Sequence, residues 1–428
     1  MIFHEVSSGE TLSSIARDYD TTVAALISYN GIPNPENLAV GQCIVIVYPT
    51  LTHTVQAGDS VYSIAEQYGI STNALYRNNP QLSALPDIYP GEVLVIELED
   101  NKIGSFETGG YSYLDVDQTL LRESMPFMNY LMPFTYGFTA LGELVAIEDR
   151  KFIDTAHLYG VKCFLHLSTL TEDGNFSNEL SGIILNDTAL QDVLISNIID
   201  TIQSQGYDGL DIDFEFVNAE NAYAYAEFIY KARVALNELG YEVFTALAPK
   251  TSDDQKGLLY EGHLYREIGE AANAVLLMTY EWGYTYGPPL PVSPIESVRR
   301  VLDYAVTRIP PEKIFMGMSN YGYDWPLPYM KGETMAQSLS TDEALLLASD
   351  NGAEIRYDIN SAAPYFSYVK DDIVHEVWFE DARSIGTRLT LVEEYGFRGC
   401  LYWNISRRNV QNLLMINELV DLPENNLE

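Results

Sequence analysis

Hydrophobic and polar positions alternate most regularly between residues 208 and 215, where the chain reads Asp-Gly-Leu-Asp-Ile-Asp-Phe-Glu. Three carboxylates, Asp211, Asp213 and Glu215, occupy every second position, and apolar residues fill the places between them. Because side chains of a β-strand point alternately to its two faces, this pattern predicts a strand with all three acids on one face. The apolar face fits a strand of a parallel barrel that is covered by helices, with the acids near the carboxyl ends where such barrels hold their active sites.

From about residue 104 onward, short apolar runs alternate with segments of helical periodicity, for example 192–205 and 222–239. This alternation is typical of βα units and of a parallel sheet, and the remaining length suits a (β/α)8 barrel. The long interval at about 325–380 predicts a small inserted α+β subdomain that forms one wall of a cleft. The predicted strands are 105–111, 130–136, 162–167, 209–216, 243–248, 274–279, 314–318 and 399–403.

The first hundred residues contain an internal repeat. Residues 4–16 align with residues 53–65 without a gap, and Asn30 and Asn79 keep the same spacing. Each unit has the pattern strand, helix, helix, strand, and two units are too few to build a solenoid. The sequence therefore predicts two small modules ahead of a barrel domain. Their ranges are 2–47, 52–97 and 104–428.

The net charge of -37 limits the kinds of partner that this chain can bind. So acidic a surface repels phosphate backbones and anionic lipid, which argues against nucleic-acid and membrane partners. No apolar run reaches the roughly 18 residues of a membrane span, and the first residues lack the basic start and apolar core of a secretory signal peptide. The cysteines and histidines show no metal-binding spacing, so we expect no metal, no other cofactor and no obligate protein partner.

Three carboxylates crowded on one strand face have a specific chemical consequence. Mutual repulsion and partial burial raise some of their pKa values, and the set then titrates together and shares protons. A shared proton provides a general acid near neutral pH. The alternative is a metal site or a satisfied acidic patch. The apolar residues between the acids argue against a calcium loop, which needs turn-forming and oxygen-bearing residues there.

The stretch 208–215 resembles the catalytic signature Asp-Gly-x-Asp-x-Asp-x-Glu of glycoside hydrolase family 18, the chitinase-like family, at every position. This family uses substrate assistance, in which the acetamido oxygen of the sugar attacks its own anomeric carbon. The resemblance implies that Glu215 is the general acid and base, that Asp213 orients the acetamido group, and that Asp211 shares a proton with Asp213.

The resemblance extends to the ends of other predicted strands. The run Met-Thr-Tyr-Glu ends the sixth strand, where the family carries Met-x-Tyr-Asp. It implies that Tyr280 holds the acetamido oxygen and that Glu281, which replaces the usual aspartate, contacts substrate. Trp403 is expected to be the apolar floor of the -1 subsite, because an indole face fits the C–H face of a sugar. Three further residues could bind sugar hydroxyls or only shape loops, namely Tyr136, Asn320 and Tyr321.

The repeated modules resemble LysM domains, which bind the N-acetylglucosamine of peptidoglycan or chitin. The resemblance implies glycan contacts at residues 8–12 with 29–33 and at residues 57–61 with 78–82. A protein-binding or purely structural repeat is the alternative.

The whole chain, including the stretch 377–384, resembles the spore-cortex-lytic N-acetylglucosaminidases of endospore-forming bacteria. This implies a retaining β-N-acetylglucosaminidase that cleaves cortex peptidoglycan during germination, at the spore coat, cortex or cell wall. One alternative is a chitinase or endo-N-acetylglucosaminidase acting on chitin or N-glycans. Another is a catalytically inactive carbohydrate-binding spore-coat protein.

Overall fold

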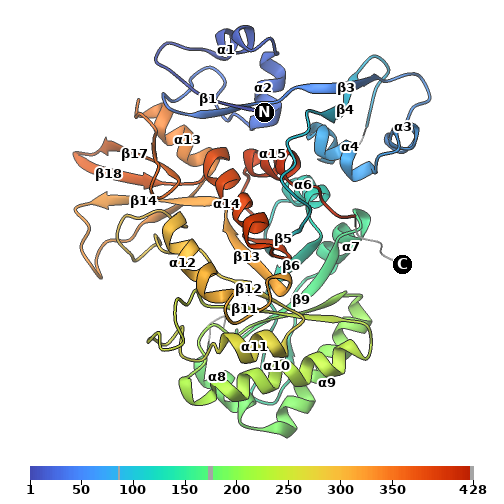
Figure 1. The fold of residues 1–428 in the computed structure, drawn as a ribbon, viewed down its shortest axis with the longest axis vertical. Coiled ribbons are helices and arrows are strands. Elements are labelled where there is room, and N and C mark those ends of the chain that lie inside the picture. Colours follow the sequence, from blue (N-terminus) through green and yellow to red (C-terminus); the bar gives the residue numbers. More distant parts are fainter. Residues whose placement is uncertain (85–86, 172–176, 425–428) are drawn as a thin grey trace.

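A closed barrel of eight parallel strands forms the larger part of the chain, as the sequence predicts (Figure 1). The structure, a computed structural model, describes residues 1–84, 87–171 and 177–424. The strands adjoin in the order β10-β11-β12-β13-β19-β5-β6-β9. They are β5 (Glu107–Tyr113), β6 (Tyr130–Phe134), β9 (Lys162–Ser168), β10 (Gly209–Asp213), β11 (Glu242–Leu247), β12 (Ala274–Leu277), β13 (Ile314–Ser319) and β19 (Gly399–Trp403).

Helices cover the outside of the barrel between the strands. They are α6 (Gln118–Ser124), α7 (Arg150–Leu158), α8 (Asn178–Leu185), α9 (Thr188–Gln205), α10 (Ala222–Asn237), α11 (Tyr265–Ala271), α12 (Ile295–Ala305), α14 (Ala382–Tyr395) and α15 (Val410–Leu419). The short elements are β7 (Gly137–Phe138), β8 (Leu144–Val145) and the 3-10 turns η1 (Met125–Phe127), η2 (Ala219–Asn221) and η3 (Pro311–Lys313). No helix within the described ranges is long and apolar enough to span a membrane.

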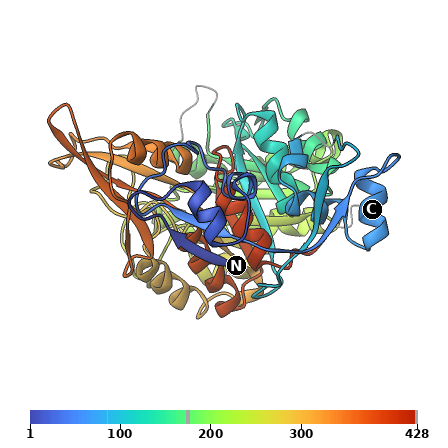
Figure 2. The same ribbon diagram turned by 90° about the horizontal axis from the view of Figure 1, so that it is seen from above.

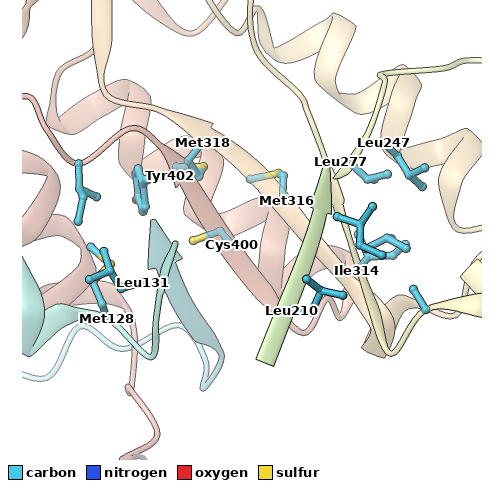
Figure 3. Close-up of a cluster of buried hydrophobic side chains, with 14 of the residues drawn as sticks. Met128, Leu131, Leu210, Leu247, Leu277, Ile314, Met316, Met318, Cys400 and Tyr402 are labelled. Atoms are coloured by element: carbon cyan, nitrogen blue, oxygen red, sulfur yellow. The ribbon is translucent and has the colours of Figure 1, made fainter. Parts of the chain in front are cut away.

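The barrel strands separate two apolar layers. Leu210, Ile212 and Phe214 are fully buried and belong to the large core between the strands and the outer helices. Figure 3 shows Leu210 in a part of this core with Leu277 and Ile314, which come from other strands. A separate cluster, rich in aromatic rings, fills the interior of the barrel. The alternation of residues 210–214 therefore places the apolar side chains under the helices, as predicted, and the acids toward the barrel axis.

The predicted strand at 209–216 is shorter in the structure. Its ladder with β9 ends where Asp213 lies opposite Ser168, and its ladder with β11 ends at Ile212. Glu215 therefore lies just beyond the end of β10, on the segment that leads to η2. The inward alternation continues far enough to bring this side chain to the same cavity as Asp213.

A five-stranded antiparallel sheet is inserted between β13 and β19, and it has a small apolar core of its own. Its strands adjoin in the order β15-β14-β18-β17-β16, and Figure 1 shows the sheet beside the barrel. The insertion begins immediately after β13, a few residues before the predicted limit. Its elements are β14 (Tyr321–Leu327), β15 (Gln337–Ser340), α13 (Thr341–Asp350), β16 (Arg356–Asp358), β17 (Ala363–Lys370) and β18 (Ile373–Trp378).

Each N-terminal module has the predicted order of strand, helix, helix and strand, with its own apolar core. The second also has a short additional helix. Thr11 and Ser60, at matching positions, cap the first helix of each module by accepting from the backbone N–H three residues on. The elements are β1 (Ile2–Glu5), α1 (Leu12–Asp18), α2 (Val23–Asn30) and β2 (Cys43–Ile46), then β3 (Pro49–Thr54), α3 (Val61–Tyr68), α4 (Thr72–Asn78), α5 (Gln81–Ala84) and β4 (Val93–Leu98).

The first module is packed against both the barrel and the inserted sheet. Gln411 of α15 donates to the carbonyl oxygen of Cys43 at 2.8 Å and to the side chain of Asn30 at 3.1 Å. The backbone N–H of Ile355, in the inserted subdomain, donates to the carbonyl oxygen of Val40 at 2.8 Å. Figure 2 shows this module between the inserted sheet and the second module.

The second module contacts the barrel through α4 and α5. Asn73 donates to the carbonyl oxygen of Tyr159 at 2.7 Å, and Arg77 donates to that of Pro126 at 2.9 Å. Its loop at Tyr89–Glu92 is exposed, whereas the corresponding loop of the first module is largely covered.

Candidate active site

A cavity of about 250 Å³ opens at the carboxyl ends of the barrel strands. Five of the residues singled out from the sequence line it, from the ends of β10, β12 and β19. They are Asp213, Glu215, Tyr280, Glu281 and Trp403. The barrel thus gathers at one place residues that are far apart in the sequence, because parallel strands end on the same side.

Asp211 lies behind this cavity and does not line it. The side chain is fully buried, and one carboxylate oxygen, Oδ2, accepts a hydrogen bond from the hydroxyl of Tyr111 on β5 at 2.8 Å. Burial raises the pKa of Asp211 to about 6, although the Tyr111 hydrogen bond opposes the shift. The buried imidazole of His166, on β9, faces both acids.

Asp213 and Glu215 are the two acids that reach the cavity. Burial raises the pKa of each carboxyl, and the negative charges of Asp213 and Glu281 raise that of Glu215 further. Two such acids share protons and titrate as a pair. This environment keeps a proton available on Glu215 near neutral pH, which a general acid requires.

Tyr280 and Glu281 follow β12, which is two strands from β10 in the barrel. The Tyr280 phenol is nearly buried, and burial together with the charge of Asp213 raises its pKa well above the usual range, so it remains a hydrogen-bond donor. Glu281 has a φ of 66°, an uncommon conformation for a residue other than glycine. Its carboxylate accepts hydrogen bonds from Tyr321 and, at 3.0 Å, from Tyr323. The inserted sheet therefore fixes Glu281 at the cavity wall.

Trp403 ends β19 and forms an aromatic wall of the cavity. Its ring contacts those of Tyr111, Tyr113 and Phe134, with centroids 4.9–5.7 Å apart. These contacts fix the indole while leaving it partly exposed. A fixed, partly exposed indole can receive the apolar face of a sugar ring.

The structure does not bring three of the predicted residues to this cavity. Tyr136 is buried, and its hydroxyl donates to Asp149, which also accepts from Tyr207. Asn320 is buried near Asn409, and Tyr321 lies behind Glu281. These contacts give Tyr136 and Asn320 packing environments away from the cavity and give Tyr321 an indirect connection to it.

Several residues that sequence reasoning did not select also form the site. Tyr111 and His166 contact the acids from β5 and β9, and Trp282 and Tyr260 line the cavity. Tyr111 and His166 occupy inward positions of strands that the sequence does predict. The register of β9 with β10 places His166 opposite Asp211, and Tyr111 reaches Asp211 across the barrel from β5, which does not pair with β10.

The two predicted glycan-contact regions differ in their surroundings. In the first module, Tyr29, Asn30, Gly31 and Ile32 are buried. A Cβ atom added to Gly31 would lie 2.5 Å from Val410 of α15. In the second module, the corresponding residues 78–82 are only partly covered: Asn79 and Leu82 are buried, Asn78 and Pro80 are half-buried, and Gln81 is exposed.

A parallel barrel with a protonatable glutamate, a neighbouring aspartate and an aromatic wall in one cavity defines a class of protein, the barrel enzymes that hydrolyse glycosides. The sequence matches the profile of Glycosyl hydrolases family 18 over residues 136–407 and the LysM domain profile over residues 4–47 and 53–97. The chain belongs to glycoside hydrolase family 18, carries two LysM domains, and is a glycosidase.

Relatives share this whole arrangement. The cortical fragment-lytic enzyme of Bacillus subtilis (strain 168) is 38% identical over 422 residues, which cover 98% of each chain. The putative sporulation-specific glycosylase YdhD of the same organism is 30% identical over 408 residues, 95% of this chain and 96% of that protein. The crystal structure of the Bacillus megaterium QM B1551 spore cortex-lytic enzyme SleL has a TM-score of 0.83 at 36% identity, and the match covers 99% of this chain and 98% of that one.

Proposed function

We propose that this chain is a retaining β-N-acetylglucosaminidase that cleaves spore-cortex peptidoglycan during germination by substrate-assisted catalysis. One observation supports it most directly: Glu215, Asp213 and Tyr280 meet in a single cavity. The names of full-length relatives, a cortical fragment-lytic enzyme and a spore cortex-lytic enzyme, support the substrate and the location at the spore.

In the proposed reaction, Glu215 gives its proton to the glycosidic oxygen as the bond to the leaving sugar breaks. The acetamido oxygen of the -1 sugar attacks the anomeric carbon from the other side, which forms a cyclic oxazolinium. The hydroxyl of Tyr280 donates to that acetamido oxygen and aligns it. Asp213 accepts a hydrogen bond from the amide N–H of the acetamido group and stabilises the positive charge that develops on the sugar and the oxazolinium.

Water then completes the reaction. Glu215, now ionised, takes a proton from a water molecule that attacks the anomeric carbon, and the acetamido group is restored. The two displacements leave the anomeric configuration unchanged. The indole of Trp403 holds the apolar face of the -1 sugar, and Glu281, held by its two tyrosines, contacts the sugar's polar edge.

The LysM domains are proposed to hold the enzyme on its substrate. The predicted contact residues 78–82 of the second module are partly open, whereas residues 29–32 of the first are all buried. We therefore assign most of the peptidoglycan binding to the second module. A bound module raises the local concentration of glycan around the barrel cavity.

The test compares wild type with Glu215→Gln on digested spore-cortex fragments, vegetative peptidoglycan and chitin oligomers, with products identified by mass spectrometry. We expect products of the wild type that end in N-acetylglucosamine, and a loss of activity in the variant of about 10²- to 10⁴-fold. Glu220→Gln is the matched control, because Glu220 is exposed and five positions along the same segment.

The outcomes separate the alternatives. Full activity of Glu215→Gln would refute the catalytic assignment. Cleavage of chitin oligomers alone would make the chain a chitinase. Products ending in muramic acid would show that it cuts the other glycosidic bond. NMR can follow the anomeric configuration of the first product. An inverted configuration would exclude substrate assistance, which retains it.

A further inference from the structure

His166 faces the acid pair with one ring nitrogen. In the parallel register of β9 and β10 it lies opposite Asp211. The imidazole is fully buried, and its Nε2 lies 3.5 Å from Asp213 Oδ2 and 3.8 Å from Asp211 Oδ2. Within the described part of the chain, this Nε2 has no hydrogen-bond partner, and neither do Asp211 Oδ1 and Asp213 Oδ1. Buried polar atoms without a partner are rare and need an explanation.

The other ring nitrogen determines the tautomer. Nδ1 of His166 lies 2.6 Å from the hydroxyl of Thr135. That hydroxyl also lies 3.0 Å from the carbonyl oxygen of Tyr136, 3.3 Å from that of His166 and 3.1 Å from the hydroxyl of Ser168. A carbonyl oxygen only accepts, and a hydroxyl has one hydrogen to give. We assign the Thr135 hydrogen to one of these carbonyl oxygens, so that Oγ1 accepts from Nδ1–H and Nε2 of the neutral ring carries a lone pair.

The lone pair on Nε2 faces carboxyl oxygens, which also carry lone pairs. Because lone pairs repel one another, a proton must lie between Nε2 and one of these oxygens. Burial lowers the pKa of His166 to about 4 and raises those of Asp211, to about 6, and Asp213. The proton is therefore carried by a carboxyl group and not by the ring. Asp213 Oδ2 is the nearer oxygen, and Asp211 Oδ2 already accepts from Tyr111.

The remaining titratable groups near this proton come from three other segments. They are Tyr111 on β5, Tyr280 after β12, and Glu215 after β10. Burial raises the pKa of both tyrosines well above the usual range, so they stay neutral. The three acids are thus the groups that exchange the proton near neutral pH, while His166 stays neutral.

We infer that His166 is a positioning residue, whose Nε2 accepts a hydrogen bond from the protonated Asp213 carboxyl and thereby presents the other oxygen, Oδ1, to the substrate's amide N–H. Nothing else among the described residues occupies either atom. This hydrogen bond describes the enzyme before the glycosidic bond breaks, and it involves no covalent change beyond the position of that proton. This role rests on the proposed function, since the amide belongs to the proposed substrate.

The first test reads the tautomer without any substrate. In ¹⁵N NMR of the histidine-labelled full chain at pH 5–8, we expect His166 to be neutral with its proton on Nδ1. Its signals are those missing from His166→Gln. His263 is an internal control, because its Nδ1 accepts from the backbone N–H of Ala248 at 2.8 Å and its Nε2 lies 3.1 Å from the carbonyl oxygen of Phe214. His263 must therefore be the opposite tautomer. A proton on Nε2 of His166 would overturn the inference.

The second test compares His166→Leu with His166→Gln. Leucine removes the acceptor, whereas the glutamine amide oxygen can reach the place of Nε2 and accept. We expect kcat to fall roughly 10- to 100-fold in the leucine variant, since the protonated carboxyl is left without a partner, and to recover in part in the glutamine variant. The apparent pKa of the acid pair, read from the pH dependence of kcat, should fall in the leucine variant only, because the protonated carboxyl loses its hydrogen-bond acceptor.

A purely structural role would lower the Tm of both variants and leave the pH profile unchanged, and that result would refute the inference. Failure of the wild type to cleave any acetamido glycan would refute the proposed function instead. In that case, the NMR measurement still decides the tautomer of His166.

Discussion

The acids of the site are kept in an environment that favours their protonated forms. Asp211 illustrates the cost, because burial raises its pKa to about 6 from an ordinary value near 4. A carboxyl whose pKa is higher in the folded state stabilises the fold fully below the unfolded value, and that stabilisation is lost as pH rises through the folded value. Above about pH 6, the ionised Asp211 is therefore a cost that the enzyme tolerates for its function.

Replacing this carboxyl by an amide should reveal that cost. Asn in place of Asp211 can still accept from Tyr111 but cannot ionise. We expect Asp211→Asn to have the same Tm as wild type at pH 4 and a higher Tm at pH 8. The gain in unfolding free energy at pH 8 should reach up to about 3 kcal/mol. The variant should lose most of its activity. Thermal unfolding followed at both pH values provides the measurement.

A suitable control is Asp200→Asn, because Asp200 is an exposed aspartate on α9. The difference in Tm between this variant and wild type should be the same at pH 4 and at pH 8. A gain for Asp211→Asn that is equal at pH 4 and pH 8 would mean that the amide improves packing and that ionisation of Asp211 is not the cause.

Strand β13 lies so close to β12 that only glycine fits at one position. A Cβ added to Gly317 would lie 2.4 Å from the carbonyl oxygen of Leu277 and 2.7 Å from the ring of Tyr280. The hydroxyl of Thr279 donates to the carbonyl oxygen of Gly317 at 2.7 Å and holds the two strands together. The position of the Tyr280 phenol thus depends on the neighbouring strand.

Gly317→Ala should displace Tyr280. We expect a loss of stability of about 1–3 kcal/mol from overpacking and a fall in kcat/KM of at least about 10-fold, as expected when a catalytic group is misplaced. Gly182→Ala, in helix α8, adds the same methyl group where the nearest atom, on the Asn221 side chain, is 3.3 Å away. This control should keep its activity. Unchanged kinetics of Gly317→Ala would show that Tyr280 does not need its present position.

At the scale of single elements, the sequence predicts most of what the structure contains. The alternation around Asp211 and the apolar runs predict all eight barrel strands and the inward direction of the acids. The end of β10 is not predicted, because a strand ends where its neighbours stop pairing, and the register with β9 and β11 is not written in the local sequence. His166 is not predicted for the same reason, and Tyr111 is not predicted because it meets Asp211 across the closed barrel. The position of Tyr136 after a predicted strand does not bring it to the cavity.

At the scale of the whole molecule, the two LysM domains have similar folds but different surroundings. Their repeated sequences predict equivalent modules. The first, however, is packed between α15 and the inserted sheet, where Ala39 joins the apolar core of that sheet. The second module contacts the barrel through α4 and α5 and leaves its loop at Tyr89–Glu92 exposed. Surroundings of this kind depend on surfaces far away in the sequence, which a repeat pattern does not contain.

Two matching glycines, Gly41 and Gly91, allow this difference to be measured. Both have positive φ, of 80° and 97°, so alanine causes similar backbone strain at each. A Cβ on Gly41 would lie 1.8 Å from the carbonyl oxygen of Ile355, whereas one on Gly91 has nothing within 4 Å. Gly91→Ala therefore reports the strain alone, and Gly41→Ala reports the strain together with the loss of contact between the module and the inserted sheet.

We expect Gly41→Ala to lower the unfolding free energy by clearly more than the roughly 1 kcal/mol of Gly91→Ala, because the carbonyl of Ile355 belongs to the backbone and cannot move aside cheaply. Limited proteolysis should also cut Gly41→Ala faster between the first module and the barrel. Thermal unfolding and proteolysis of the two full-length variants in parallel measure both effects. Equal losses would show that the first module is not held by the inserted sheet, and the two LysM domains would then be equivalent in solution as well as in sequence.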